Sequence, residues 1–225
     1  MSGVDFDLDK LHDIPDPYAA SAPAPSAPVP QGPSPTRSSV TRRRAMLVGL
    51  ALSAVTLVAL GMGAAHRPAQ HAAFYVFALG LPILGGLCAL AAGWASGTKG
   101  LGLRPAQLAS ALGVAVALFA LSTLAEHLGA VHEGGMKGTG ACAAISALLA
   151  AVPLAAGFVA FRRSLAGNVA LRMACFGVGS GVLGAVLLRV HCPNDAAAHV
   201  ALGHGAAVLL GALAGAIAGR ATARL

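Results

Sequence analysis

Residues 171–190 read LRMACFGVGSGVLGAVLLRV. Its two charged side chains, Arg172 and Arg189, lie at the ends, and everything between them is apolar or small. A helix of about 20 residues crosses the roughly 30 Å hydrocarbon core of a bilayer, because each residue adds about 1.5 Å. Backbone groups in lipid must bond within their own segment. We therefore predict a transmembrane helix here.

Five further stretches have the same length and character: 45–65, 74–94, 108–128, 142–161 and 200–219. The chain of 225 residues is 56% hydrophobic and only 10% charged, with a mean hydropathy of +0.75. This composition excludes an ordinary soluble domain. The predicted fold class is all-α: a polytopic membrane protein with six transmembrane helices, preceded by a disordered cytoplasmic tail.

The distribution of positive charge predicts the orientation of these helices. With the N-terminus inside, the cytoplasmic side holds Lys10, Arg37, Arg42, Arg43, Arg44, Lys99, Arg104, Arg162, Arg163, Arg172, Arg220 and Arg224. The outer side holds only Arg67, Lys137 and Arg189. Because Lys and Arg are retained in cytoplasmic loops, we expect a multi-pass protein of the bacterial inner membrane with both termini in the cytoplasm.

The chain has three predicted parts: residues 1–18, 19–44 and 45–225. The first is an acidic and apolar segment, the second a Pro/Ala/Ser linker that ends in a basic triplet at the lipid bilayer, and the third the transmembrane domain. Interleaved acids and apolar residues are typical of segments that fold onto a partner with a basic surface. The candidate binding residues are Asp5, Phe6, Asp7, Leu8, Asp9, Leu11, Asp13 and Ile14. The alternative is an inert, solvated tail.

Histidines and two cysteines gather on the predicted outer side. The candidate sensing residues are Cys142, Cys192, His191, His132, His199 and His204. The cysteines could form a disulfide, could bind a soft metal together with His191 or His132, or could be oxidised directly. Histidines at a membrane interface also occur simply as hydrogen-bonded polar tips. The sequence leaves these alternatives open, assigns no metal and predicts no cofactor.

Glycines recur at a spacing of four residues in the last two predicted helices. Gly211, Gly215 and Gly219 share one face of the last predicted helix, and Gly177 and Gly181 share one face of the fifth, so we expect close helix packing there.

The motif HEGGM at 132–136 lacks the second histidine of a zincin, and GVGSG at 177–181 lacks the glycine spacing of a serine hydrolase. We expect no enzymatic activity.

One part of the sequence is more specific than its composition. The pair Arg162-Arg163, the glycine-rich stretch 171–190, the run HCPND at 191–195 and His204-Gly205 together resemble the six-helix integral-membrane anti-sigma factors of the NrsF and CarR type. Those proteins typically carry an acid after His-Cys-Pro and a Trp-His before the last helix. Here Asn194 stands at the position of the acid, with Asp195 beside it, and Gly203 replaces the Trp.

The resemblance implies a function. It implies binding of an extracytoplasmic-function sigma factor, which is kept from RNA polymerase until a stimulus releases it, and a sensing role for Cys142 and Cys192. A protease or regulatory membrane protein would be a further partner, and no direct contact with nucleic acid is expected. The extended tail is similar to CarR-type members, which implies control of carotenoid synthesis by light or oxidative stress. The alternative function is a metal- or redox-sensing protein of the outer face with an inert tail.

Overall fold

The computed structural model describes residues 37–61, 63, 75–95, 103–129, 135–161, 167–194 and 196–222. The chain divides into two units, Met1–Ser39 and Val40–Leu225, and the description that follows concerns the second. The predicted partner-binding residues of segment 1–18 lie outside the described part of the chain.

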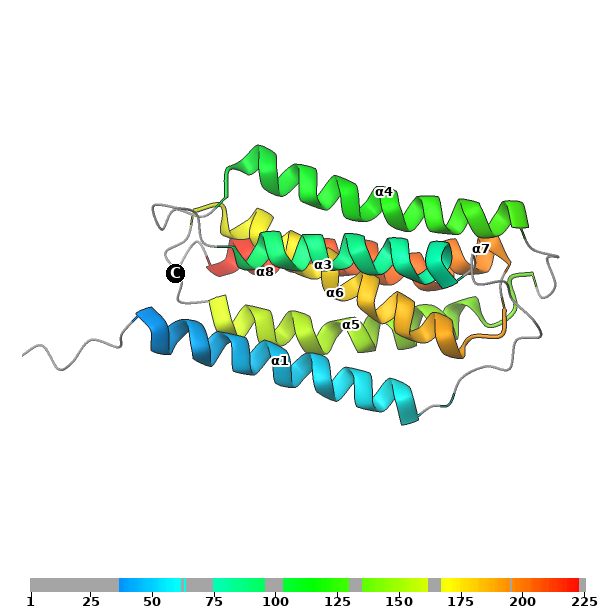
Figure 1. Ribbon diagram of the computed structural model, residues 1–225, viewed down its shortest axis with the longest axis horizontal. Helices are drawn as coiled ribbons and strands as arrows, with labels where there is room; N and C mark the ends of the chain where they lie inside the picture. Colours follow the sequence, from blue (N-terminus) through cyan, green and yellow to red (C-terminus); the bar gives the residue numbers. More distant parts are fainter. Residues whose placement is uncertain are drawn as a thin grey trace, which may run out of the picture. The chain divides into compact units, whose positions relative to one another are not determined.

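The described residues form helices and connecting turns, without a strand (Figure 1). The elements are α1 Arg37–Gly61, η3 Tyr75–Gly80, α3 Leu81–Trp94, α4 Pro105–Gly129, α5 Thr139–Phe161, α6 Val169–His191, α7 Ala197–His199, η4 Val200–His204 and α8 Gly205–Thr222. The two elements η3 and η4 are wider π-helical turns that continue directly into α3 and α8. The all-α class expected from the sequence is confirmed.

Five helical segments are long and apolar enough to cross a membrane. They are Val76–Trp94, Pro105–Ala125, Thr139–Ala160, Val169–His191 and Ala197–Thr222, and each end lies within three residues of the span expected from the sequence. The sixth expected span, 45–65, stays a prediction. The apolar part of α1 that the structure describes, Ala45–Val58, is shorter than the other five.

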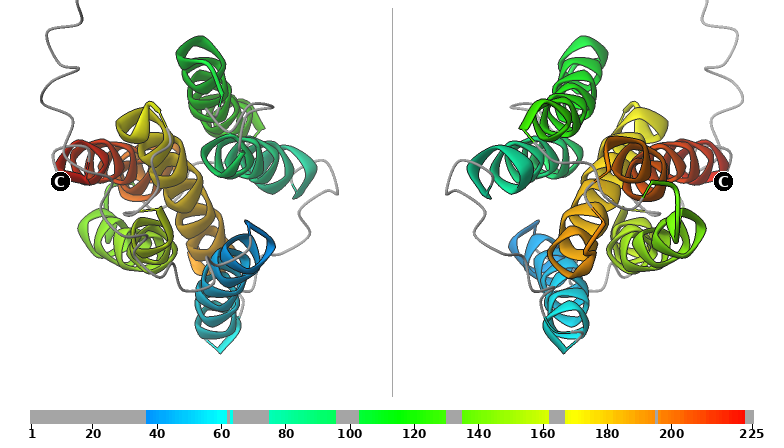
Figure 2. Two further views of the ribbon diagram at one scale, coloured as in Figure 1. Left: turned by 90° about the vertical axis from the view of Figure 1, so that its left-hand side faces the viewer. Right: turned by 90° about the vertical axis from the view of Figure 1, so that its right-hand side faces the viewer.

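Helix α6 lies at the centre of the bundle. Viewed along the helices, α3, α5 and α8 surround it, and α4 lies outside α3 (Figure 2). Most of α6 is buried, including Phe176, Val178 and Val182, whereas only about a fifth of the α4 span is buried (22%). Because α6 is apolar on all sides and contacts four other helices, it is the element that the rest of the bundle packs around.

The contact between α6 and α8 is made by glycines. A methyl group on Gly177 would collide with the backbone of Gly211, and one on Gly181 would collide with the backbone at Ala207. Gly215 lies in the same way against the backbone of Met173. Missing side chains let the two backbones approach directly, which favours helix association where lipid removes the hydrophobic driving force. The glycine faces expected from the sequence are confirmed.

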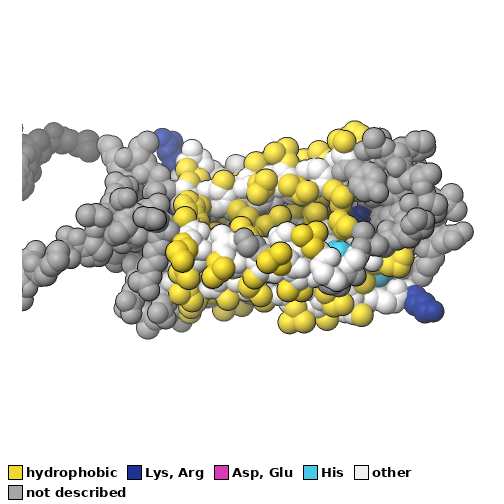
Figure 3. Space-filling model, turned by 60° about the horizontal axis from the view of Figure 1, so that its bottom comes forward, with side chains coloured by type: hydrophobic (Ala, Val, Ile, Leu, Met, Phe, Trp, Pro, Cys, Tyr) yellow, Lys and Arg dark blue, Asp and Glu magenta, His cyan; other side chains and the backbone are white. Residues whose placement is uncertain are grey.

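The surface around this core is apolar. Large hydrophobic side chains are exposed along the helices, among them Leu57, Leu84, Leu148, Leu209 and Leu213. Figure 3 shows hydrophobic side chains along the middle of one face and positively charged side chains near its two ends. Exposed apolar area on this scale is unfavourable in water and is the surface that a bilayer solvates.

A buried arginine joins α6 to the end of α3. Arg172 Nε donates a hydrogen bond to the carbonyl oxygen of Gly93 (3.1 Å), and its Nη2 donates to those of Trp94 (3.2 Å) and Ala95 (3.1 Å). The last carbonyls of a helix have no partner within the helix. The guanidinium, with its several donors, satisfies three of them at once and places a positive charge at the negative end of the helix dipole.

The glycine contact predicts a sharp difference between two substitutions. Gly215→Leu should destabilise the folded protein by at least about 1 to 3 kcal/mol, because the side chain has no space between α6 and α8. Gly113→Leu on α4 is the matched control, since Gly113 is exposed and nothing lies within 4 Å of an added Cβ there. Thermal unfolding of the two variants in detergent would measure this. Equal unfolding temperatures would contradict the tight α6–α8 packing.

Arg172 gives a second prediction. Arg172→Ala leaves three carbonyls at the end of α3 without their donor, and each such group costs about 1 to 3 kcal/mol when buried. The exposed Arg104 is the control, and Arg104→Ala should leave the unfolding temperature unchanged. Arg172→Lys should recover only part of the loss, because an ammonium lacks the planar fork of donors. A full recovery by lysine would show that charge alone is sufficient.

Candidate functional site

Four side chains that could bind or sense converge at one end of the bundle. They are Cys142, Cys192, His199 and His204, and one potential ligand atom of each lies within 4.8 Å of all the others. We call these four residues the Cys/His cluster. Cys192, His199 and His204 are buried, and Cys142 is partly buried. Residues so far apart in the sequence meet only because α5, α6 and α8 pack side by side.

The two cysteines come from opposite helix ends. Cys142 lies in the first turn of α5, after a turn in which Gly135 and Gly138 have positive φ values of 51° and 78°. Cys192 directly follows α6, and its amide bonds to the carbonyl of Leu188. Pro193 comes next and cannot continue the helix. The end of α6 thus presents Cys192 to the beginning of α5.

Asn194 holds these two ends together. Its side-chain amide nitrogen donates to the carbonyl oxygens of Gly135 (3.1 Å) and Lys137 (3.3 Å), and its side-chain oxygen accepts from the backbone amide of Ala196 (3.1 Å). A carboxylate could not donate the first two bonds. An asparagine at this position therefore ties the loop that follows Cys192 to the turn that precedes Cys142.

The π-helical element η4 places the two histidines. In an α-helix of 3.6 residues per turn, residues five apart point about 140° away from each other. A π-helical turn, with its i to i+5 bonding, stacks such residues above one another. His199 directly precedes η4 and His204 ends it, and their ring centroids lie 5.5 Å apart. The wide turn therefore brings both rings to the same side of the helix.

Two close contacts within the cluster involve the sulfur of Cys192. It lies 3.7 Å from the sulfur of Cys142 and 3.2 Å from Nε2 of His199. All four cysteines of the chain are free thiols in this structure. The two thiols are thus in contact but form no disulfide. The thiol of Cys192 is also within hydrogen-bond distance of the imidazole of His199.

Hydrogen bonds to the other ring nitrogens fix the tautomers of both histidines. Nδ1 of His204 lies 3.1 Å from the carbonyl oxygen of Ala185, which can only accept, so Nδ1 carries the proton. Nδ1 of His199 lies 3.1 Å from Oγ1 of Thr139, whose own proton goes to the carbonyl of Met136 (2.7 Å). Oγ1 therefore accepts from His199 as well. In both neutral rings the lone pair then resides on Nε2.

A buried positive charge lies beside the cluster. Arg189 is buried in the last turn of α6, three residues before Cys192. Its charge is near enough to act on His199. A cation at this place offsets the negative charge that a thiolate would bring into the apolar bundle.

Four of the six predicted sensing residues meet in the cluster. His191 does not join them, although it adjoins Cys192 in the sequence, and its Nδ1 instead contacts the carbonyl of Gly63. His132 lies outside the described residues. The other two cysteines are separate from the cluster: Cys175 is buried and donates to the carbonyl of Leu108, and Cys88 is exposed.

Thr139 belongs to the site but was not among the residues predicted from the sequence. A threonine at the start of a predicted helix, three residues before Cys142, is a signal for a helix-end hydrogen bond, but nothing in the sequence pairs it with His199, which is 60 residues away. The hydrogen bonds by which Asn194 joins the loop to the turn were likewise not predictable from the sequence.

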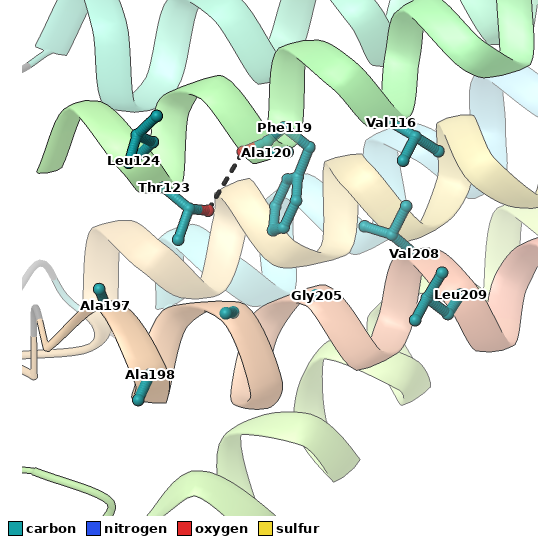
Figure 4. Close-up of a pocket in the computed structure, with 11 residues that line it drawn as sticks. Val116, Phe119, Ala120, Thr123, Leu124, Ala197, Ala198, Gly205, Val208 and Leu209 are labelled. Carbon is teal, nitrogen blue, oxygen red and sulfur yellow. Dashed lines mark hydrogen bonds between the residues drawn. The ribbon is translucent and has the colours of Figure 1, made fainter. Parts of the chain in front are cut away.

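An apolar pocket borders the cluster on its other side. It has a volume of about 550 Å³ and lies between α4 and the α7–η4–α8 helix (Figure 4). Ala198 and Gly205, which adjoin His199 and His204, form part of its wall, with Phe119 opposite. The hydroxyl of Thr123 bonds to the carbonyl of Phe119. The pocket therefore suits an apolar group. The reactive side chains at this end of the bundle are those of the Cys/His cluster.

Together these features define a class: a bundle of helices able to span a membrane, with a thiol and imidazole cluster at one end. A comparison with known families is more specific. Residues 29–225 match the NrsF family, described as negative regulator of sigma F, and the chain belongs to this family. The resemblance noted from the sequence is confirmed, and the family description implies that the protein restrains a sigma factor. Searches of curated proteins and of solved structures gave no significant match.

The geometry of the thiol pair predicts a selective oxidation. A disulfide bond is about 2.05 Å long, so the two sulfurs, now 3.7 Å apart, need to approach by only about 1.7 Å. Mild oxidation with diamide should therefore lower the number of alkylatable thiols from four to two, as measured by mass spectrometry. Cys142→Ser or Cys192→Ser should prevent this intramolecular change, and Cys88→Ser should not. Loss of a different pair of thiols would contradict the observed contact.

Proposed function

We propose that the protein is a membrane-bound anti-sigma factor. It sequesters an extracytoplasmic-function sigma factor at the bacterial inner membrane and releases it when a stimulus reaches the Cys/His cluster. The observation that carries this proposal is the match of residues 29–225 to the negative regulators of sigma F. The protein acts by binding and not by catalysis.

The positions of the basic residues support the orientation. Arg172 lies near the beginning of α6, and the packing of Gly219 against Ala170 brings Arg220 to the same end of the bundle. Leu103, which precedes Arg104, and Leu171 pack against the same buried cluster at that end. Lys137 is at the opposite end, beside Asn194. The arginine-rich end is therefore cytoplasmic, and the Cys/His cluster faces the outer side.

The sigma factor binds to the acidic segment 1–18. Phe6, Leu8, Leu11 and Ile14 provide apolar anchors, and the intervening acids attract a basic partner surface. The family match begins at residue 29, so this contact is supported by the chemistry of the segment alone. The linker holds the segment near the membrane, which raises its effective concentration for a sigma factor that arrives there.

Helix α6 provides the connection between the two ends. Cys192 follows its outer end, and Arg172 near its inner end holds the last carbonyls of α3. A displacement of α6 at the Cys/His cluster thus acts on the cytoplasmic loop that follows α3. About 1 to 3 kcal/mol of coupling would change the affinity for the sigma factor about 5- to 150-fold.

The chemistry of the Cys/His cluster suggests oxidants or soft metal ions as the stimulus. Control of carotenoid synthesis by light is supported only by the similarity of the extended tail to CarR-type proteins. A protease that removes the protein after stimulation would produce the same release of sigma factor, and would act downstream of the cluster.

The tail contact is tested with the full-length protein in lipid nanodiscs. Immobilised protein should capture an extracytoplasmic-function sigma factor, identified by mass spectrometry, and the capture should weaken as salt rises. Replacing Phe6, Leu8, Leu11 and Ile14 together by alanine should lower the captured amount at least about tenfold, since several anchors are lost. Pro23→Ala and Pro25→Ala in the linker are the matched controls and should leave capture unchanged.

Two outcomes would contradict parts of this proposal. If the full-length protein captures no sigma factor, the sequestration of such a factor is wrong. If the alanine variant captures as much as the unaltered chain, the tail is inert and the sigma factor binds elsewhere on the cytoplasmic face.

A further inference from the structure

We propose that Cys142, Cys192, His199 and His204 form a binding site for a single soft d10 metal ion, Zn²⁺ or Cu⁺, held by two thiolates and two imidazoles. This site rests on the geometry of the cluster and is independent of the proposed function. Only its use as the signal for sigma-factor release rests on that function.

The first support is the donor set. Two sulfur and two imidazole ligands are a standard tetrahedral set for Zn²⁺, and thiolates also select Cu⁺. All four potential ligand atoms lie within 4.8 Å of one another, and three of the four residues are buried. A closed set of four protein ligands without an exposed carboxylate is typical of a site that binds its ion tightly rather than of a chance surface group.

The second support is the spacing of the ligand atoms. With Zn–S bonds of about 2.3 Å, two sulfurs of a tetrahedral site lie about 3.8 Å apart, and a sulfur and an imidazole nitrogen lie about 3.6 Å apart. The observed distances are 3.7 Å between the two sulfurs and 3.2 Å between Sγ of Cys192 and Nε2 of His199. The thiols are thus already at the separation that a metal ion requires.

The third support comes from the groups behind the histidines. Imidazoles that bind metal almost always donate their second ring N–H to an oxygen, which fixes the tautomer and the ring orientation. His204 donates in this way to Ala185, and His199 to Thr139. Both hydrogen bonds place the proton on Nδ1 and the lone pair on Nε2. A mere pair of polar tips would not require that both rings carry the proton on the same nitrogen.

Binding of the ion changes no oxidation state. Two metal–sulfur and two metal–nitrogen bonds form, the two S–H bonds break, and their protons leave to solvent. The buried Arg189 beside His199 offsets negative charge that the thiolates bring. A bound ion would also hold the beginning of α5 and the end of α6 to the helix that carries both histidines, and would occupy the thiols that a disulfide needs.

The test uses purified, reduced, full-length protein in detergent. Cd²⁺ serves as the spectroscopic probe, because its thiolate complexes absorb in the near ultraviolet. One equivalent should saturate the signal, and Cys192→Ser should reduce its amplitude by about half, since one of two thiolates is lost. Competition with a chromophoric chelator then compares Zn²⁺ with Cu⁺, and the tighter ion is assigned as the resident one.

Two further variants separate ligands from neighbours. Thr139→Val should weaken binding by about 10- to 100-fold because His199 loses its orienting partner, and Thr139→Ser should restore it. His191→Ala and Cys88→Ser, which lie outside the cluster, should leave the affinity unchanged. Circular dichroism and gel filtration verify that each variant is folded. Unaltered Cd²⁺ binding by folded Cys142→Ser and Cys192→Ser would overturn the site.

The two hypotheses fail in different ways. If the chain binds the ion but sigma-factor capture in nanodiscs does not change on adding it, the metal site stands and its role as the signal is wrong. If no ion binds while capture still depends on segment 1–18, the metal site is wrong and the sequestration of a sigma factor stands.

Discussion

The direct backbone contact between α6 and α8 sets the arrangement of the other helices and of the Cys/His cluster. Glycines on both helices remove the side chains that would separate them, so the two axes approach closely over their whole shared length. This leaves α6 free to contact α3, α4 and α5 on its remaining faces. It also fixes the height of α8 relative to α6. The position of His204 against Ala185, and with it the Cys/His cluster, follows from that register.

The positions of the helices were predictable because lipid imposes a simple rule on sequence. A run of about 20 apolar residues has few alternatives to a helix, and five of the six expected spans therefore agree with the observed ones. The glycine faces were predictable for the same reason, since a spacing of four repeats on one side of a helix. The span 45–65 stays a prediction, since the structure describes only Ala45–Val58 of α1 as an apolar stretch.

The membership of the site was only partly predictable. Proximity in sequence suggested His191 as the partner of Cys192, yet neighbouring residues point about 100° apart on a helix, and His191 reaches Gly63 instead. The loop that Asn194 holds places His199 against Cys192, and no local sequence pattern predicts this contact. Thr139 and Ala185 orient the two rings through contacts between different helices. Such contacts depend on how the helices pack and leave no local pattern in the sequence.

The π-helical turn η4 allows the chain to tolerate a change of one residue in length at this place. A π turn contains one residue more than the α turn that it replaces, so it behaves as an absorbed insertion. Deleting one residue between His199 and His204 would return the segment to plain α geometry, with the histidines four apart and still on one side. The glycines of α8 would keep their register on α6. The extra residue is therefore accommodated locally, and the bundle on one side and the loop on the other need not adjust to it.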